Sequence, residues 1–180
     1  MIEVTIDGIS MTEAGFLVLL RQAGDERALP IAIGSAEAQA ILFELNGMEF
    51  PRPLTHDLFR HVLTELGATL AKVEITELRD ATFFALLHLD SRSGPIQVDA
   101  RPSDALALAL RCSAPVYVAD EVMASAGVAI DKAGKQARLK SKSSTDPAEE
   151  LRAKLERAVA EERYEEAARL RDQLRALSEK

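Results

Sequence analysis

Two patterns of apolar residues alternate along the first 130 positions and predict strands and helices in a repeating order. Short β-rich runs bounded by glycine or polar turns predict strands, and a stretch with helical signals follows each group of three. The strand-like runs are IEVTIDGI, GFLVLL and ALPIAI, then KVEITEL, TFFALLHL and PIQVDA, with a last short run PVYVAD. This order predicts one compact, mixed α+β domain over residues 1–130, and we interpret its two β-β-β-α units as a pseudo-duplication.

Residues that favour the N-cap position precede three stretches in which apolar residues recur with helical spacing. Ser35 is a candidate cap for a helix that runs to about Asn46, and Thr55 for a helix that runs to about Leu66. Ser103 is the candidate cap of a third helix, whose sequence is DALALALR. We therefore expect a polar first turn at the start of each helix.

The last 50 residues have a different pattern. Residues 131–145 are polar and basic, which predicts a flexible linker. Residues 146–149 read Asp-Pro-Ala-Glu, a cap, a first-turn proline and a carboxylate that together signal a helix start. Two narrow apolar stripes follow and predict an antiparallel helical hairpin over residues 146–180. So narrow an interface leaves apolar surface for a protein partner or another copy of the chain, so we expect a homo-oligomer.

Charge is distributed unevenly along the chain. Residues 1–130 contain 9 Lys and Arg against 18 Asp and Glu, a net charge of −9, whereas residues 131–147 carry +3 and residues 148–180 carry −1. An acidic main domain repels phosphate backbones, so it would need a local device to bind nucleic acid. The basic linker is expected to act as a tether, or else to contact phosphate.

Several classes of protein are disfavoured by what the sequence lacks. Its N-terminus has no basic region before an apolar stretch, and no apolar run is long enough to span a bilayer, which predicts a cytoplasmic protein with no membrane association. The single cysteine, Cys112, forms no internal disulfide. A phosphate loop of the Walker type and the GxSxG, HExxH and CxxC motifs are all missing.

Two carboxylates are the first candidates for chemistry. Glu37 and Asp104 each stand in the first turn of a predicted helix that follows a strand, one in each unit. If the two units bring them together, they are candidates for catalysis and for holding a divalent cation such as Mg²⁺. The alternative is that they only complement the helix dipoles, which requires no ligand.

Cations lie beside the same helix starts. Arg101 and Ser103 precede or begin the third helix, where free backbone N–H groups favour a phosphate. Alternatively, Arg101 pairs with a carboxylate such as Asp99 or Glu37 and fixes the loop. Arg52 is a third candidate for binding phosphate.

His56 and Asp57 follow Arg52 closely, at the start of the second helix. Near neutral pH a histidine serves as acid or base, and a neighbouring carboxylate can orient it. Both are therefore candidate catalytic residues. The alternative is a helix start capped by Thr55 with an exposed imidazole.

The main domain resembles the bifunctional nuclease domain family of small bacterial and plant proteins. The resemblance rests on residues 33–38 (IGSAEA), 52–58 (RPLTHDL) and 99–106 (DARPSDAL). It implies a bacterial protein that cuts RNA and DNA, with nucleic acid as its substrate.

Residues 164–172 (YEEAARLRD) resemble the UVR motif of nucleotide-excision-repair subunits. In those subunits the motif is a helical hairpin for subunit contact, and the resemblance implies that role here. The residues expected to bind the partner are Tyr164, Leu170, Arg171 and Asp172.

Two hypotheses follow. The first is a nuclease that hydrolyses phosphodiester bonds of RNA and DNA with little sequence preference, with the hairpin for protein contact. The second is a non-catalytic adaptor or regulatory protein that oligomerises and docks a repair or stress-response partner through the hairpin.

Overall fold

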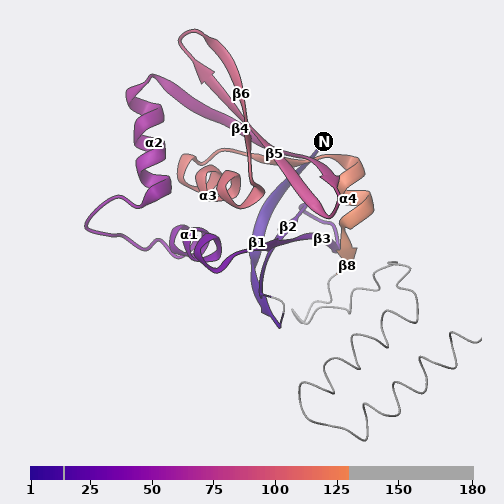
Figure 1. The fold of residues 1–180 in the computed structure, drawn as a ribbon. Coiled ribbons are helices and arrows are strands. Elements are labelled where there is room, and N and C mark those ends of the chain that lie inside the picture. Colours follow the sequence, from indigo (N-terminus) through magenta and orange to yellow (C-terminus); the bar gives the residue numbers. More distant parts are fainter. Residues whose placement is uncertain (14, 130–180) are drawn as a thin grey trace, which may run out of the picture. The chain divides into compact units, whose positions relative to one another are not determined.

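The computed structural model describes residues 1–13 and 15–129, which form an eight-stranded sheet and four helices (Figure 1). The strands are β1 (Ile2–Thr12), β2 (Gly15–Arg21), β3 (Arg27–Ile33), β4 (Ala68–Arg79), β5 (Thr82–Ser91), β6 (Gly94–Ala100), β7 (Val116–Val118) and β8 (Val128–Ala129). The helices are α1 (Ser35–Leu45), α2 (Thr55–Glu65), α3 (Pro102–Cys112) and α4 (Asp120–Ala126). The mixed α+β class predicted from the sequence is confirmed.

Strand order in the sheet is β6-β5-β4-β7-β1-β2-β3-β8. The β1-β2-β3 and β4-β5-β6 groups are antiparallel meanders, and the short β7 lies between them, antiparallel to β1 and parallel to β4. The sheet therefore has two edges, β6 and β8. That the two meanders are a duplicated unit stays a prediction.

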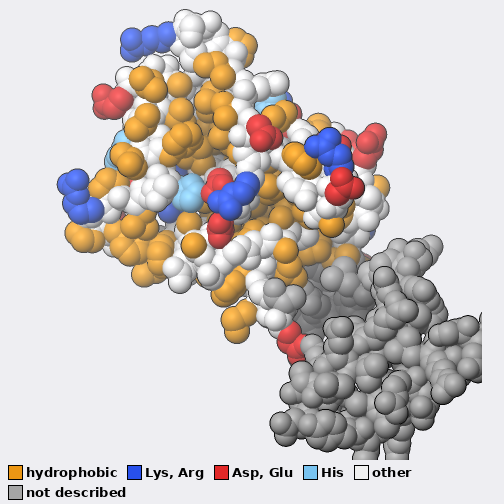
Figure 2. Space-filling view, in the orientation of Figure 1, with side chains coloured by type: hydrophobic (Ala, Val, Ile, Leu, Met, Phe, Trp, Pro, Cys, Tyr) orange, Lys and Arg blue, Asp and Glu red, His pale blue; other side chains and the backbone are white. Residues whose placement is uncertain are grey.

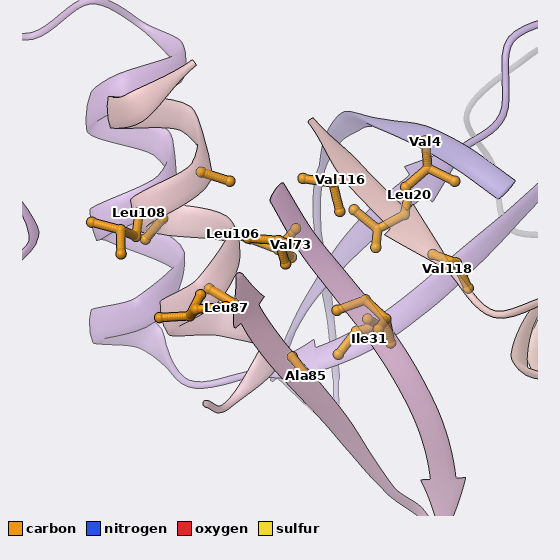
Figure 3. Packing of buried hydrophobic residues seen from close by; sticks show 14 of the residues in the cluster. Val4, Leu20, Ile31, Val73, Ala85, Leu87, Leu106, Leu108, Val116 and Val118 are labelled. Atoms are coloured by element: carbon orange, nitrogen blue, oxygen red, sulfur yellow. The ribbon is translucent and has the colours of Figure 1, made fainter. Parts of the chain in front are cut away.

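Helix α3 lies at the centre of the core. Its sequence is apolar at nearly every position, as expected for a helix covered on several sides, and it packs on β4 and β5 and against α1 and α2. Leu106 and Leu108 of α3 meet Val73 of β4 and Leu87 of β5 (Figure 3). Each such buried side chain contributes roughly 1.5–3 kcal/mol, so this contact fixes where the start of α3 lies.

The predicted caps Ser35 and Thr55 are wrong by one residue, and Ser103 is wrong by two. The N-cap positions are Gly34, Leu54 and Arg101, and none of the three makes a side-chain capping bond. At α2 the carboxylate of Asp57 accepts a hydrogen bond from the Leu54 N–H at 2.8 Å, which satisfies the free backbone donor at the N-cap. At α3 the proline Pro102 occupies the first turn, where its missing N–H costs nothing.

Within residues 1–13 and 15–129, no helix is long and apolar enough to cross a membrane. The linker predicted at 131–145 and the hairpin predicted at 146–180 lie outside the described residues.

The contact of α3 with the sheet predicts a large effect of Leu106→Ala. Leu106 is fully buried, and its truncation should reduce the free energy of unfolding by about 2–5 kcal/mol through lost burial and a residual cavity. Urea unfolding followed by circular dichroism measures the loss. Leu45→Ala, at the exposed end of α1, is the matched control and should cost far less. Equal losses would contradict this description of the core.

Candidate functional site

A buried arginine joins the three helices that frame the candidate site. The Arg111 side chain, on α3, is only 2% exposed. Its Nε donates to Asp57 Oδ1 at 2.6 Å, and its Nη1 donates to the carbonyl oxygens of Ala40 at 3.1 Å and Ala107 at 2.8 Å. Arg60 Nη1 in turn donates to the Arg111 carbonyl at 3.1 Å. Helices α1 and α2 are thereby held on α3, and their first turns come together.

Asp57 is the carboxylate partner of the buried Arg111. Burial of its carboxyl opposes ionisation, but the hydrogen bond from the Leu54 N–H and the hydrogen bond and charge of Arg111 outweigh burial, so the pKa of Asp57 is lowered. The carboxylate therefore stays ionised and binds two donors. We had expected Asp57 to orient His56, but the carboxylate that contacts the imidazole belongs to Asp104.

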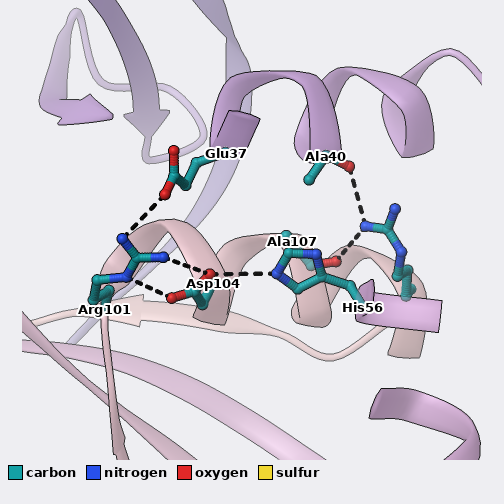
Figure 4. A network of polar contacts seen from close by, with 7 residues as sticks. Glu37, Ala40, His56, Arg101, Asp104 and Ala107 are labelled. Carbon is teal, nitrogen blue, oxygen red and sulfur yellow. Dashed lines mark hydrogen bonds and ion pairs between the residues drawn. The ribbon is translucent and has the colours of Figure 1, made fainter. Parts of the chain in front are cut away.

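Four side chains from the starts of α1, α2 and α3 form what we call the Arg101 cluster: Glu37, His56, Arg101 and Asp104 (Figure 4). Arg101 binds Asp104 with two bonds, Nε to Oδ2 at 2.7 Å and Nη2 to Oδ1 at 3.2 Å. Its Nη1 lies 3.0 Å from Glu37 Oε1. His56 Nε2 lies 3.4 Å from Asp104 Oδ1. The structure thus brings together four of the residues singled out in the sequence.

The guanidinium of Arg101 is the exposed member of the cluster. Its side chain is 66% exposed, whereas that of His56 is 17% exposed. The hydrogen bonds and charge of Asp104, followed by those of Glu37, raise the pKa of Arg101, so it remains a cation. Pairing with Glu37 was one of the two alternatives for Arg101, and it is observed. The cluster therefore presents a charged, partly accessible fork to solvent.

The backbone at the start of α1 positions the carboxylate of Glu37. Glu37 lies over Gly34, the N-cap of α1, and a side chain at Gly34 would collide with its carboxylate. Glycine at this position therefore lets Glu37 fold back toward Arg101. Ser103 is buried and lines a pocket of about 390 Å³ together with Gly34, Glu37 and Arg101.

Other predicted residues lie apart. Arg52 is exposed in the loop before α2, and none of the ion pairs or hydrogen bonds within the described part of the chain involves it. The expected partner-binding residues, Tyr164, Leu170, Arg171 and Asp172, lie outside the described residues.

The predicted metal ligands converge on a guanidinium. Glu37 and Asp104 are both bound to Arg101, which occupies the space between them. Over residues 1–13 and 15–129 there is no group of three or more His, Cys, Asp or Glu suited to a metal ion. Since Mg²⁺ requires oxygen ligands free of other cations, this donor set does not fit it while Arg101 is in place. The Mg²⁺ site stays a prediction that requires Arg101 to turn away.

An apolar pocket of about 630 Å³ adjoins the cluster. Its polar end is formed by His56, Arg101 and Asp104, and its walls by side chains of α2, α3 and the outer strands: Leu58, Phe59, Val62, Leu87, Val98 and Leu108. In Figure 2 hydrophobic side chains gather over the upper part of this face, beside a basic side chain flanked by acidic ones. The cluster thus borders a large apolar surface.

A second polar group was missed in the sequence. Glu74 of β4 contacts His88 of β5, Oε2 to Nε2 at 2.7 Å, and accepts from Lys72 Nζ at 2.6 Å. The Lys72 hydrogen bond, opposed by burial and supported by His88, lowers the pKa of Glu74. Neither the Arg101 cluster nor its pockets include these residues, so we assign them to the stability of the sheet.

Comparisons with known proteins give two family matches. The family model of the bifunctional nuclease domain matches residues 18–131, which include the whole Arg101 cluster. The model of the UvrB/uvrC motif matches residues 146–180. Both resemblances noted in the sequence are confirmed.

Individual relatives are bacterial and plant proteins. An uncharacterized protein of Mycobacterium tuberculosis is 49% identical over 114 residues, which are 63% of this chain and 68% of the relative. Bifunctional nuclease 1 of Arabidopsis thaliana is 27% identical over 177 residues, with 88% of this chain and 54% of the relative covered. Bifunctional nuclease of Oryza minuta is 26% identical over 181 residues, with 88% and 53% covered. The chain spans about half the length of the two plant relatives.

The anchoring role of Arg111 predicts different costs for the same substitution at two arginines. Arg111→Met should reduce the free energy of unfolding by about 3–5 kcal/mol, because it leaves Asp57 and two carbonyls without their buried donor. Arg101→Met removes an exposed ion pair and should lower the stability far less, because exposed pairs contribute little. Urea unfolding of both variants measures the difference, and similar unfolding midpoints would refute the anchoring role of Arg111.

The loss of folding stability at acidic pH should depend on Asp57. Because its pKa in the folded state is lowered from 3.8, its ionisation stabilises the fold above about pH 4, and this contribution disappears as the pH falls through the lower folded-state pKa. Asp57→Asn should therefore be less stable than the parent near neutral pH and lose less on going from about pH 5 to about pH 3. Asp80→Asn, on an exposed turn, should follow the parent's pH profile in the same unfolding assay.

Proposed function

The chain belongs to the bifunctional nuclease domain family, and from this membership we propose that it hydrolyses phosphodiester bonds of RNA and DNA with little sequence preference. The plant relatives are named bifunctional nucleases. The observation that carries the proposal is the Arg101 cluster, where three helix starts bring a guanidinium, two carboxylates and an imidazole within contact distance.

The cluster supplies a local, positively charged group, which an acidic domain needs in order to bind phosphate. Arg101 presents a planar fork that matches phosphate oxygens, and its exposure leaves it accessible. Three helix N-termini point to the same region, and their partial positive charges favour an anion. A phosphate bound here competes with Glu37 and Asp104 for Arg101 and frees those carboxylates.

His56 is the proposed base. Its Nε2 lies 3.4 Å from Asp104 Oδ1, so the carboxylate orients the ring and leaves Nδ1 to accept a proton. A water that loses its proton to Nδ1 attacks phosphorus, the bond to the leaving sugar oxygen breaks, and that oxygen takes a proton from solvent or from His56. Arg101 stabilises the charge that develops on the phosphate oxygens.

The segment that matches the UvrB/uvrC motif is proposed as the part for protein contact. Tyr164, Leu170, Arg171 and Asp172 are the residues expected to bind the partner. Arg52, Ser103 and the basic residues of 131–145 are proposed as further phosphate contacts.

The second candidate function is a non-catalytic adaptor or regulatory protein that docks a repair or stress-response partner. One observation favours it: both candidate catalytic carboxylates are already paired with Arg101. In that case the cluster is a structural ion-pair network, and the segment at 146–180 carries the function.

Hydrolysis of labelled single-stranded RNA and DNA by the purified full chain tests the proposal. His56→Ala should lower the rate about 10²-fold or more, as expected for loss of a general base, and a Glu37→Ala/Asp104→Ala double variant should be similarly impaired. His61→Ala, one turn along the exposed side of α2, is the matched control and should retain the parent's rate.

Cluster variants that cut as fast as a cutting parent would refute the catalytic role of the Arg101 cluster. A parent chain that cuts neither substrate with or without Mg²⁺ or Mn²⁺ would instead decide for the adaptor. Capture of a protein partner that is lost in Tyr164→Ala and Leu170→Ala variants would then support docking as the function.

A further inference from the structure

The two edges of the sheet are unequal. One edge strand, β8, has two residues, whereas the other, β6, has seven and is exposed along most of its length. Natural proteins usually protect a long edge with charged residues, proline, a bulge or a covering segment, because unpaired N–H and C=O groups bind other strands. No strand among residues 1–13 and 15–129 pairs with the outer side of β6, and the protective residues within it are one proline, Pro95, and one carboxylate, Asp99.

Proline shows which backbone groups face outward. Pro95 lacks an N–H, and within sheets proline is placed so that its nitrogen faces away from the neighbouring strand. Because backbone direction alternates along an antiparallel strand, Gln97 and Asp99 share the orientation of Pro95. Their N–H and C=O groups therefore form the open edge.

An exposed apolar face lies beside this open edge. Its members are 37% to 71% exposed and come from β6 and from α2: Ile96, Val98, Leu58, Phe59, Val62 and Leu66. Ile96 and Val98 stand in register with Leu89 and Leu87 of β5, which are buried, so the apolar side of the sheet continues to its edge uncovered. We call these six residues the α2–β6 face, and contiguous apolar surface of this kind marks an interaction site.

We propose that a second copy of this chain pairs with β6 through an antiparallel two-fold contact centred on Gln97, and that it covers the α2–β6 face. In this register Gln97 lies opposite Gln97, and Pro95 opposite Asp99. The Gln97 pair exchanges two hydrogen bonds, and each Asp99 N–H donates to the Pro95 carbonyl of the other copy. Only the Asp99 carbonyl oxygen of each copy lacks a donor, because it faces the proline nitrogen, so the edge is otherwise complementary to itself.

Side chains and charge favour an identical partner. In the Gln97-centred register Ile96 of each copy lies opposite Val98 of the other, so both apolar sides are covered by cross-strand pairs. Residues 94–98 carry no charge, whereas residues 1–130 have a net charge of −9. A copy with the same excess of negative charge can approach closely only through such a neutral strip.

The pairing also affects the Arg101 cluster. Arg101 directly follows β6, and in the proposed register it lies opposite Ser93 in the β5–β6 turn of the second copy. Arg92 in that turn then adds a cation near each cluster. This consequence follows from the register and does not depend on the proposed nuclease activity.

Disulfide trapping tests the register in the full chain. Cys112 is the only cysteine, so Cys112→Ala provides the background. In that background Gln97→Cys should form a covalent dimer on mild oxidation, because hydrogen-bonded antiparallel partners have Cα atoms about 5.5 Å apart, within the range of a disulfide. Asp99→Cys is the matched control. Its two copies would lie four residues apart along the strand, about 13 Å, so at least tenfold less dimer is expected.

Light scattering of the uncrosslinked chain tests the association itself. The parent should have twice the 19.6 kDa mass of one chain, and Ile96→Lys/Val98→Lys should have the mass of a monomer, while Met48→Lys, exposed but outside the α2–β6 face, should remain dimeric. A monomeric parent would overturn the proposal. Equal trapping of the two cysteine variants, or a dimer that survives Ile96→Lys/Val98→Lys, would also overturn it and assign oligomerisation to another segment.

Discussion

The hydrogen bonds of one buried guanidinium hold the three helix starts of this domain in place. Arg111 is desolvated in the core, and a buried cation is tolerated only where its donors find partners. Those partners are Asp57 and the carbonyls of Ala40 and Ala107, on α2, α1 and α3. The bonds to Asp57 and Ala40 hold α2 and α1 on α3, and the bond to Ala107, within α3 itself, orients the guanidinium.

Two arginines ten positions apart have opposite roles because their environments differ. Arg111 is buried, and its N–H groups donate to two backbone carbonyls and a carboxylate. Its charge therefore contributes to the stability of the fold. Arg101 is at the surface, bound to two carboxylates that a phosphate can replace. An acidic domain thereby gains one accessible cation at a point where three helix N-termini also favour an anion. Charge composition alone disfavours nucleic acid binding, and Arg101 is the local cation on which the proposed phosphate contact rests.

The sheet has one short edge strand, β8, and one long, exposed edge strand, β6. This difference indicates where a second copy of the chain can associate. A two-residue β8 offers few backbone groups, whereas β6 offers a free backbone beside apolar side chains of α2. The strand that presents this edge ends immediately before Arg101. Pairing of two copies at β6 would therefore change the surroundings of the Arg101 cluster, and catalysis and assembly would share one part of the molecule.

Local patterns in the sequence determined the type and order of the main elements, the helix starts to within two residues, and the first-turn positions of Glu37 and Asp104, because these depend on neighbours along the chain. Which carboxylate meets His56 was decided only in the tertiary structure. Arg111 was missed for the same reason: within DALALALR it resembles an ordinary basic residue in a last helical turn, and its partners Asp57 and Ala40 are 54 and 71 positions away. Burial and partner choice arise when distant segments pack, and no local pattern encodes that contact.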